Sequence, residues 1–149
     1  MARKVKSILL DTNLLVYLYI QDSDKQKKIK ALIKTKTEEK VNLVIAEQSL
    51  LEFYSVITNP KQVKNPMPAD LARQEVDKFY NNNAFQIICP NKNTFPAFLK
   101  LIRSKNVSGS IVFDYYLAAT ALSHQVKVIY TENQKDFRSI KSIKTASPF

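Results

Sequence analysis

The sequence predicts one α/β domain over residues 1–149, a three-layer sandwich in which a parallel sheet of about five strands lies between helices. Short apolar runs suited to buried strands alternate along the chain with helical segments, which is the pattern of a parallel sheet. Hydrophobic residues make up 45% of the chain and charged residues 24%, so a chain of this length can bury a core and is not disordered. We find no repeat and no interdomain linker.

The predicted strands are short and mostly apolar, as buried parallel strands are. The first is the run 7–10, with Ile8, Leu9 and Leu10, and the remaining strands are expected at 41–45, 85–89, 126–130 and, more weakly, 143–146. One cysteine, Cys89, ends the third strand, where we expect a buried core thiol.

The predicted helices fill the segments between these strands, and we expect them at 14–20, 25–37, 48–58, 69–80, from Thr94 onward and at 113–124. Asp22, Ser23 and Asp24 offer N-caps for the second helix, and Pro60, Pro66 and Pro68 make 61–68 a loop. For the helix at 69–80 we expect inward-facing Leu71, Ala72, Val76, Phe79 and Tyr80, and for the helix from Thr94 an apolar stripe of Phe95, Phe98, Leu99 and Ile102.

Charge and composition narrow the class of protein. The net charge of +10 indicates a polyanionic partner, either nucleic acid or an acidic protein. The lysines of the second helix could form a solvated face or contact phosphates. A single cysteine excludes an internal disulfide framework, and Asp11 interrupts the first apolar run too early for a signal peptide. With no apolar run of about 20 residues, we expect a cytoplasmic protein without a membrane span.

Asp11 stands directly after the first strand, where an ionised carboxylate beside a core needs compensation. It could be the N-cap of the helix that follows, since Asp, Thr and Asn all cap helices well. It could equally be a ligand at the carboxyl edge of the sheet, where open α/β folds place their sites.

Two helical acids have similar alternatives. Asp114 shares a helix face with small apolar residues and is either an N-cap or part of a closed polar site; the capping-box residue is missing. Glu52 lies on a thin polar stripe with Gln48, Ser55 and Asn59, which could face water or a polar cleft. Asn133 and Asp136 follow the fourth strand and could be plain turn residues.

These acids fall at strand ends or on the helices that follow them, and in a parallel sheet such positions converge on one edge. Carboxylates brought together in this way cannot all stay ionised without a cation. Oxygen ligands without a His/Cys cluster favour Mg²⁺ or Mn²⁺ over zinc. Two such ions about 3.5–4 Å apart would support phosphodiester hydrolysis.

The chain resembles the PIN-domain ribonucleases, and in particular their VapC-type toxins. The four blocks that carry the resemblance are Leu9-Leu10-Asp11-Thr12-Asn13, Leu51-Glu52-Phe53, the segment from Phe113-Asp114 to Leu122, and Thr131-Glu132-Asn133-Gln134-Lys135-Asp136-Phe137. They span essentially the whole chain in the family's order. The resemblance implies a metal-dependent endoribonuclease that cleaves RNA, commonly a homodimer neutralised by a cognate antitoxin.

The resemblance also implies roles for individual residues. Asp11, Glu52 and Asp114 would be metal ligands, with Asp136 as a further catalytic acid, while Thr12, Asn13, Thr131 and Asn133 would be supporting polar residues. Some members carry Asp where Asn133 stands, so either Asn133 or Asp136 completes the site. Tyr115 and Tyr116 stand where smaller residues are common; they could narrow the cleft, stack on a base or simply pack.

Other functions remain open on the sequence alone. The Asn at 133 also fits an RNA-binding module with a degenerate site, or an RNA-processing factor without a toxin role. A DNA-directed nuclease could use the same metal chemistry. His124, the only histidine, is expected at the surface, and a Ser-His-Asp triad cannot be assembled around it.

Overall fold

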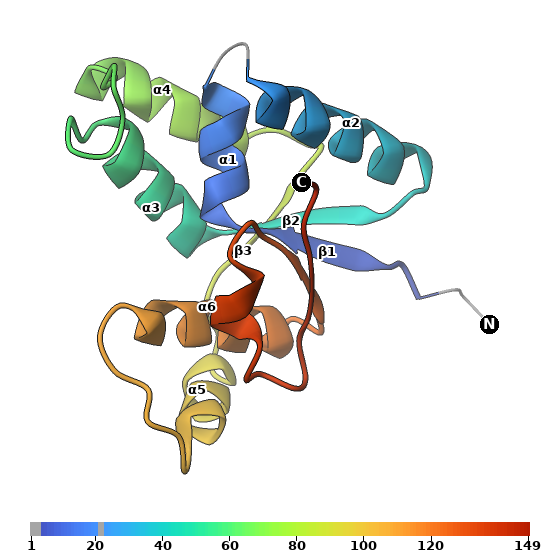
Figure 1. The fold of residues 1–149 in the computed structure, drawn as a ribbon. Helices are drawn as coiled ribbons and strands as arrows, with labels where there is room; N and C mark the ends of the chain where they lie inside the picture. The colour runs from blue at the N-terminus through green and yellow to red at the C-terminus, as the bar shows by residue number, and fades with distance from the viewer. Residues whose placement is uncertain (1–3, 21–22) are drawn as a thin grey trace.

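The computed structural model describes residues 4–20 and 23–149, and in these ranges it contains one sheet of five parallel strands in the order β3-β2-β1-β4-β5 (Figure 1). The strands are β1 Ser7–Leu10, β2 Asn42–Ala46, β3 Gln86–Ile88, β4 Val128–Tyr130 and β5 Lys144–Ala146. The helices are α1 Thr12–Tyr19, α2 Asp24–Glu38, α3 Glu47–Ile57, α4 Ala69–Tyr80, α5 Thr94–Ile102 and α6 Ile111–Ser123, with a 3₁₀ helix η1 at Gln134–Phe137. The predicted α/β fold class is confirmed.

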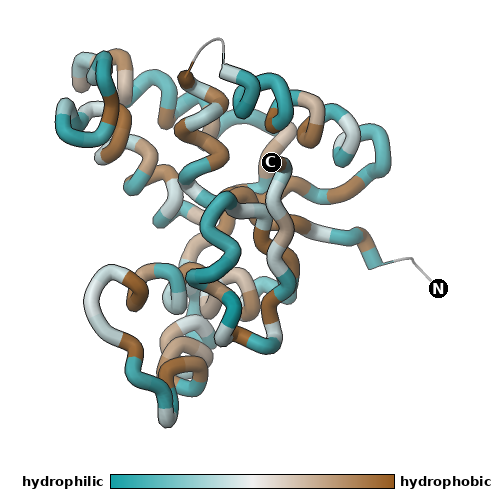
Figure 2. Tube along the Cα trace, viewed as in Figure 1, coloured by the Kyte–Doolittle hydropathy of each residue, from teal (hydrophilic) through white to brown (hydrophobic). Residues whose placement is uncertain are grey.

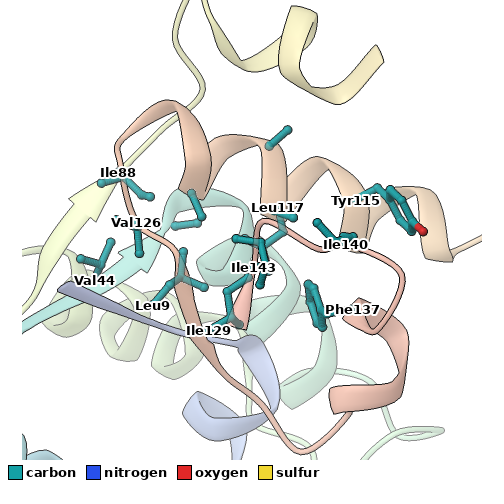
Figure 3. Close-up of a cluster of buried hydrophobic side chains, with 14 of the residues drawn as sticks. Leu9, Val44, Ile88, Tyr115, Leu117, Val126, Ile129, Phe137, Ile140 and Ile143 are labelled. Atoms are coloured by element: carbon teal, nitrogen blue, oxygen red, sulfur yellow. The ribbon is translucent and has the colours of Figure 1, made fainter. Parts of the chain in front are cut away.

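The sheet is covered on both faces because successive strand residues point to opposite sides. On β1, Ile8 and Leu10 pack with α1 to α4, whereas Leu9 packs with α5 and α6. Figure 1 shows these two layers of helices above and below the strands. The core on the α5 and α6 side of the sheet is called the lower core here. Figure 3 shows this core, in which Leu9, Val44 and Ile129 of the sheet lie next to α6. Strand β1 therefore lies in the middle of the fold.

The helix ends follow from local capping. Ser23 is the N-cap of α2 and accepts a hydrogen bond from the Gln26 amide at 3.0 Å, while the alternative cap Asp22 lies outside the described residues. Ile29 is fully buried, and much of the α2 tube in Figure 2 has the teal colour of hydrophilic residues. The 61–68 region is irregular, as its prolines require.

Several predictions of burial were wrong. Cys89 is exposed, because β3 is an edge strand that ends at Ile88 and leaves the next residue outside the core. The other exceptions are apolar residues that neighbouring helices leave uncovered: Leu71 and Tyr80 on α4, and Phe95 and Leu99 on α5, with exposed fractions of 49–57%. On α5, Phe98 is buried and Ile102 partly buried against the core shared with α6, whereas Phe95 and Leu99, the other half of the predicted stripe, face outward.

Tyr115 and Tyr116 pack rather than line the cleft. Tyr115 is buried among the residues of the lower core, and the ring of Tyr116 meets Phe98 edge-on at 5.7 Å. His124 ends α6 as its C-cap, half-buried, with Nε2 2.7 Å from the carbonyl oxygen of Cys89. In the described part of the chain, no helix is both long and apolar enough to cross a membrane.

Candidate active site at the carboxyl edge of the sheet

A cavity of about 400 Å³ opens at the carboxyl end of β1, and three of the predicted acids line it together. Asp11 follows β1 directly, Glu52 is on α3, and Asp114 is on α6. The full set of lining residues is Asp11, Thr12, Asn13, Val16, Tyr17, Ile20, Glu52, Val56, Gln62, Val63, Asp114 and Asn133. Residues separated by a hundred positions in the sequence therefore meet at one edge of the sheet, as the parallel topology requires.

Asp11 is both an N-cap and part of the cavity, so the two interpretations of its position are compatible. Its Oδ1 accepts a hydrogen bond from the Thr12 amide at 2.8 Å, at the start of α1. Its Oδ2 accepts from the Thr131 hydroxyl at 2.8 Å and from the Asn13 side-chain amide at 3.3 Å. Burial raises the pKa of Asp11 above its ordinary value, and although these hydrogen bonds oppose the shift, Glu52 and Asp136 add to it.

A second group of hydrogen bonds links this carboxylate to the turn after β4. The Asn13 side chain donates to the Thr131 hydroxyl at 3.2 Å and accepts from the Glu132 amide at 3.2 Å. The Asn133 amide donates to the Thr131 hydroxyl at 3.0 Å. Thr131 is fully buried. The first residues of α1 therefore position both Asp11 and the turn that carries Asn133.

Glu52 faces the cavity and not the solvent alone. Its Oε2 accepts from the Thr12 hydroxyl at 3.0 Å, and its Oε1 accepts from the Gln48 side chain at 2.9 Å. Gln48 also donates to the backbone carbonyl of Phe113 at 3.1 Å, which ties α3 to the start of α6. The sequence placed Gln48 on the same polar stripe as Glu52, but its link to Phe113 could be found only from the tertiary structure.

Asp114 is not a helix cap, because Ser110 occupies that position in α6. Its side chain makes no hydrogen bond within residues 4–20 and 23–149. Burial, followed by the charges of Asp11, Asp136 and Glu52 in that order, raises the pKa of Asp114 from 3.8 to about 7. A carboxyl group whose pKa is raised in this way has, in the part of the chain that the structure describes, no positive charge beside it that compensates its ionised form.

Asn133 and Asp136 occupy different positions. Asn133 lines the cavity, whereas Asp136 lies in η1 outside its lining, yet near enough to raise the pKa of both aspartates. Asn133 thus shares the cavity with the three acids, and Asp136 lies near Asp11 and Asp114.

The donor set fits a hard divalent cation. The acids contribute carboxylate oxygens, and none of the Lys or Arg side chains that the structure describes lines the cavity to neutralise them. Among the described residues, no three His, Cys, Asp or Glu side chains lie close enough together to hold an ion by themselves. Mg²⁺ keeps several waters and needs only one or two carboxylates, so this open arrangement suits it better than a closed cage would.

Comparison with known proteins decides the family. A model of the PIN domain matches residues 8–142, which is most of the chain. The chain belongs to the PIN domain family. This match includes all four acids and the polar residues around them. No curated protein matches this chain.

Solved structures share the fold at low sequence identity. VapBC2 from Rickettsia felis, solved bound to a DNA fragment from its promoter, has a chain 19% identical to this PIN domain, with a TM-score of 0.66 and coverage of 95% of this chain and 98% of that one. The sarcin–ricin loop cleaving toxin VapC20 from Mycobacterium tuberculosis is 12% identical, with a TM-score of 0.66 and coverage of 89% and 95%. VapBC-1 from nontypeable Haemophilus influenzae is 18% identical, with a TM-score of 0.65 and coverage of 95% and 98%.

The cavity also contains residues that the sequence did not single out. Gln62 and Val63, from the segment between α3 and α4, form one wall, and Tyr17 and Ile20 of the α1 region form another. The prolines around 61–68 indicate a loop, but no pattern in that segment shows which element it will contact.

Proposed function

We propose that this PIN domain is a Mg²⁺- or Mn²⁺-dependent endoribonuclease and the toxin of a toxin–antitoxin pair. The observation that carries the proposal is the convergence of Asp11, Glu52 and Asp114 on one uncompensated cavity. Family membership and the shared fold of VapC20, which cleaves the sarcin–ricin loop, support nuclease chemistry on RNA. The net charge of +10 favours a polyanionic substrate.

In this proposal the chain's own residues hold and orient the reactants. Asp11, Glu52 and Asp114 would be the metal ligands, directly or through bound water, with Asn133 or Asp136 completing the site. A bound cation would neutralise the phosphodiester and make water a better nucleophile. Thr12 and Thr131 keep two of the carboxylates in fixed orientations through the hydrogen bonds described above. This holds the acids in position before the substrate arrives.

The proposed partners are an antitoxin and a second copy of the chain. A toxin–antitoxin complex from Klebsiella pneumoniae also shares the fold, with a TM-score of 0.61, which supports an antitoxin here. Large apolar side chains such as Phe95, Leu99 and Leu51 are exposed on the single chain, which supports a homodimer. Light scattering of the purified protein would measure the oligomeric state.

The nuclease proposal is tested with the wild-type chain and Asp11→Asn on single-stranded RNA and on DNA of the same sequence. We expect RNA cleavage that needs Mg²⁺ or Mn²⁺, stops with EDTA and falls at least about 100-fold in the variant. Circular dichroism of both proteins shows whether the fold is retained. Equal cleavage by the folded variant, or cleavage without divalent ions, would overturn the proposed site.

A further inference from the structure

A second cavity of about 500 Å³ continues the first. It is lined by Tyr19, Ile20, Gln62, Val63, Lys64 and Asn65, which belong to the end of α1 and to the segment between α3 and α4. Ile20, Gln62 and Val63 line both cavities. The two spaces are therefore neighbouring parts of one groove that leads away from the acids.

The two parts of the groove carry opposite charge. Among residues 4–20 and 23–149, the first is lined by Asp11, Glu52 and Asp114 without a Lys or Arg, and the second is lined by Lys64 without an Asp or Glu. Lys64 is exposed and forms no ion pair within the described ranges of the chain. A polyanion that reached the acids through bound cations would meet an available ammonium group immediately beyond them.

The uncharged residues of the second cavity suit a nucleotide base. Tyr19 is half-buried, and its ring meets Phe53 edge-on at 6.5 Å, so the core limits its movement. Ile20 and Val63 add apolar surface, while the amides of Gln62 and Asn65 can both donate and accept hydrogen bonds. An apolar surface bordered by amides and one cation is typical of sites that bind a base and its phosphate.

We propose that the second cavity binds the nucleotide adjacent to the cleaved bond of a single-stranded RNA, with its phosphate on Lys64 and its base against Tyr19 and Ile20. The inference rests on the proposed nuclease function and adds a position for the substrate. The volume lies within the range of about 300–1,000 Å³ that holds small ligands, so it takes one unpaired nucleotide. A base within a duplex is stacked and paired and does not enter.

The first test measures binding without cleavage, so that it holds even if the nuclease proposal fails. Fluorescence anisotropy follows a labelled single-stranded RNA of about ten nucleotides in EDTA, at several salt concentrations. We expect Lys64→Gln to weaken binding several-fold and to reduce the slope of log affinity against log salt by about 0.7, the value for one single-strand phosphate contact. Lys100→Gln is the matched control, because Lys100 is also exposed but lies on α5, across the sheet.

The base contact has its own variant. Tyr19→Leu keeps an apolar side chain against Phe53 but removes the aromatic face, and circular dichroism checks that it folds. We expect weaker RNA binding with an unchanged salt slope, since no phosphate contact is lost. A duplex RNA of the same sequence should compete less well than the single strand.

The second test uses cleavage. Substrates that extend one or two nucleotides beyond the cut bond should gain in kcat/KM with the wild type and with Lys100→Gln, but not with Lys64→Gln. The proposal is overturned if Lys64→Gln and Lys100→Gln behave alike in the binding assay, or if duplex and single strand compete equally. It is also overturned if an acidic peptide binds the wild type more tightly than RNA and loses that binding in Lys64→Gln.

Discussion

Replacing Asp114 by Asn should stabilise the protein in the absence of metal and abolish the proposed activity. The carboxyl of Asp114 is half-buried without a hydrogen bond from any described residue, and its pKa is raised from 3.8 to about 7 by burial and by the neighbouring acids. The unfolded chain ionises this group from about pH 4, whereas the native chain resists ionisation until about pH 7. The native state therefore loses stability as the pH rises between these values, and the loss is complete above pH 7.

The size of the effect follows from this shift. Each pKa unit corresponds to about 1.4 kcal/mol, so the difference between 3.8 and about 7 sets an upper limit of about 4 kcal/mol. Because the carboxyl is partly open to solvent, screening reduces this, and we expect about 1–2 kcal/mol. Asn keeps the shape of the side chain without the charge. In a chain of this size that gain would raise Tm by about 3–6 °C.

The assay is urea unfolding of both proteins in EDTA at pH 4.5 and pH 8. We expect Asp114→Asn to exceed the wild type in unfolding free energy at pH 8 and to differ little from it at pH 4.5. Adding Mg²⁺ at pH 8 should stabilise the wild type more than the variant, because only the wild type retains this ligand. A variant that is less stable than the wild type at pH 8 would refute the electrostatic explanation.

Three further predictions concern the surroundings of the site and the core. Thr131→Val removes the hydroxyl that donates to Asp11 at 2.8 Å, so we expect a loss of about 1–3 kcal/mol in urea unfolding and lower activity; an unchanged free energy would contradict this role. Glu132→Gln breaks the ion pair with Lys25, but both side chains are about one-third exposed, so calorimetry should show a change below about 1 kcal/mol. Phe53→Ala should lower the unfolding free energy by about 3–5 kcal/mol because Phe53 is fully buried. Leu51→Ala, on the same helix but 70% exposed, should change it by no more than about 0.5 kcal/mol. Similar losses in the two variants would show that side-chain burial does not determine the contribution of these α3 residues to stability.

The fold could be predicted because its signals are local. Strands β1, β2 and β4 are short and mostly apolar runs, and helix α4 begins and ends at the predicted residues 69 and 80. Strand β4 begins at Val128, two residues later than predicted, because the Val126 amide donates to the Ala121 carbonyl at 2.9 Å and so closes the end of α6, with Gln125 at a φ of 58°. The packing partners could not be predicted in the same way. Whether Leu99 is covered depends on which side of α5 meets α6, and the periodicity of α5 alone does not decide that.

The site is likewise predictable where local sequence signals place its residues and unpredictable where tertiary contacts do. Asp11 could be placed at the edge of the sheet because it directly follows a buried strand, and parallel topology then brings Glu52 and Asp114 to it. The groove beyond the acids could not be predicted, since Lys64 belongs to a proline-rich segment whose path depends on tertiary contacts. The choice between Asn133 and Asp136 also depends on the turn after β4, where only Asn133 lines the cavity.

The position of β1 has a consequence for a chain emerging from the ribosome. Asp11 is made first, but its strand is flanked by β2 on one side and β4 on the other, and the hydroxyl that holds its carboxylate comes from Thr131. The polypeptide must therefore be synthesised as far as Thr131 before Asp11 acquires its native surroundings. A nascent fragment lacking β4 would expose Asp11 without Thr131, so the chemistry proposed here would begin only once β4 and the turn after it have been made.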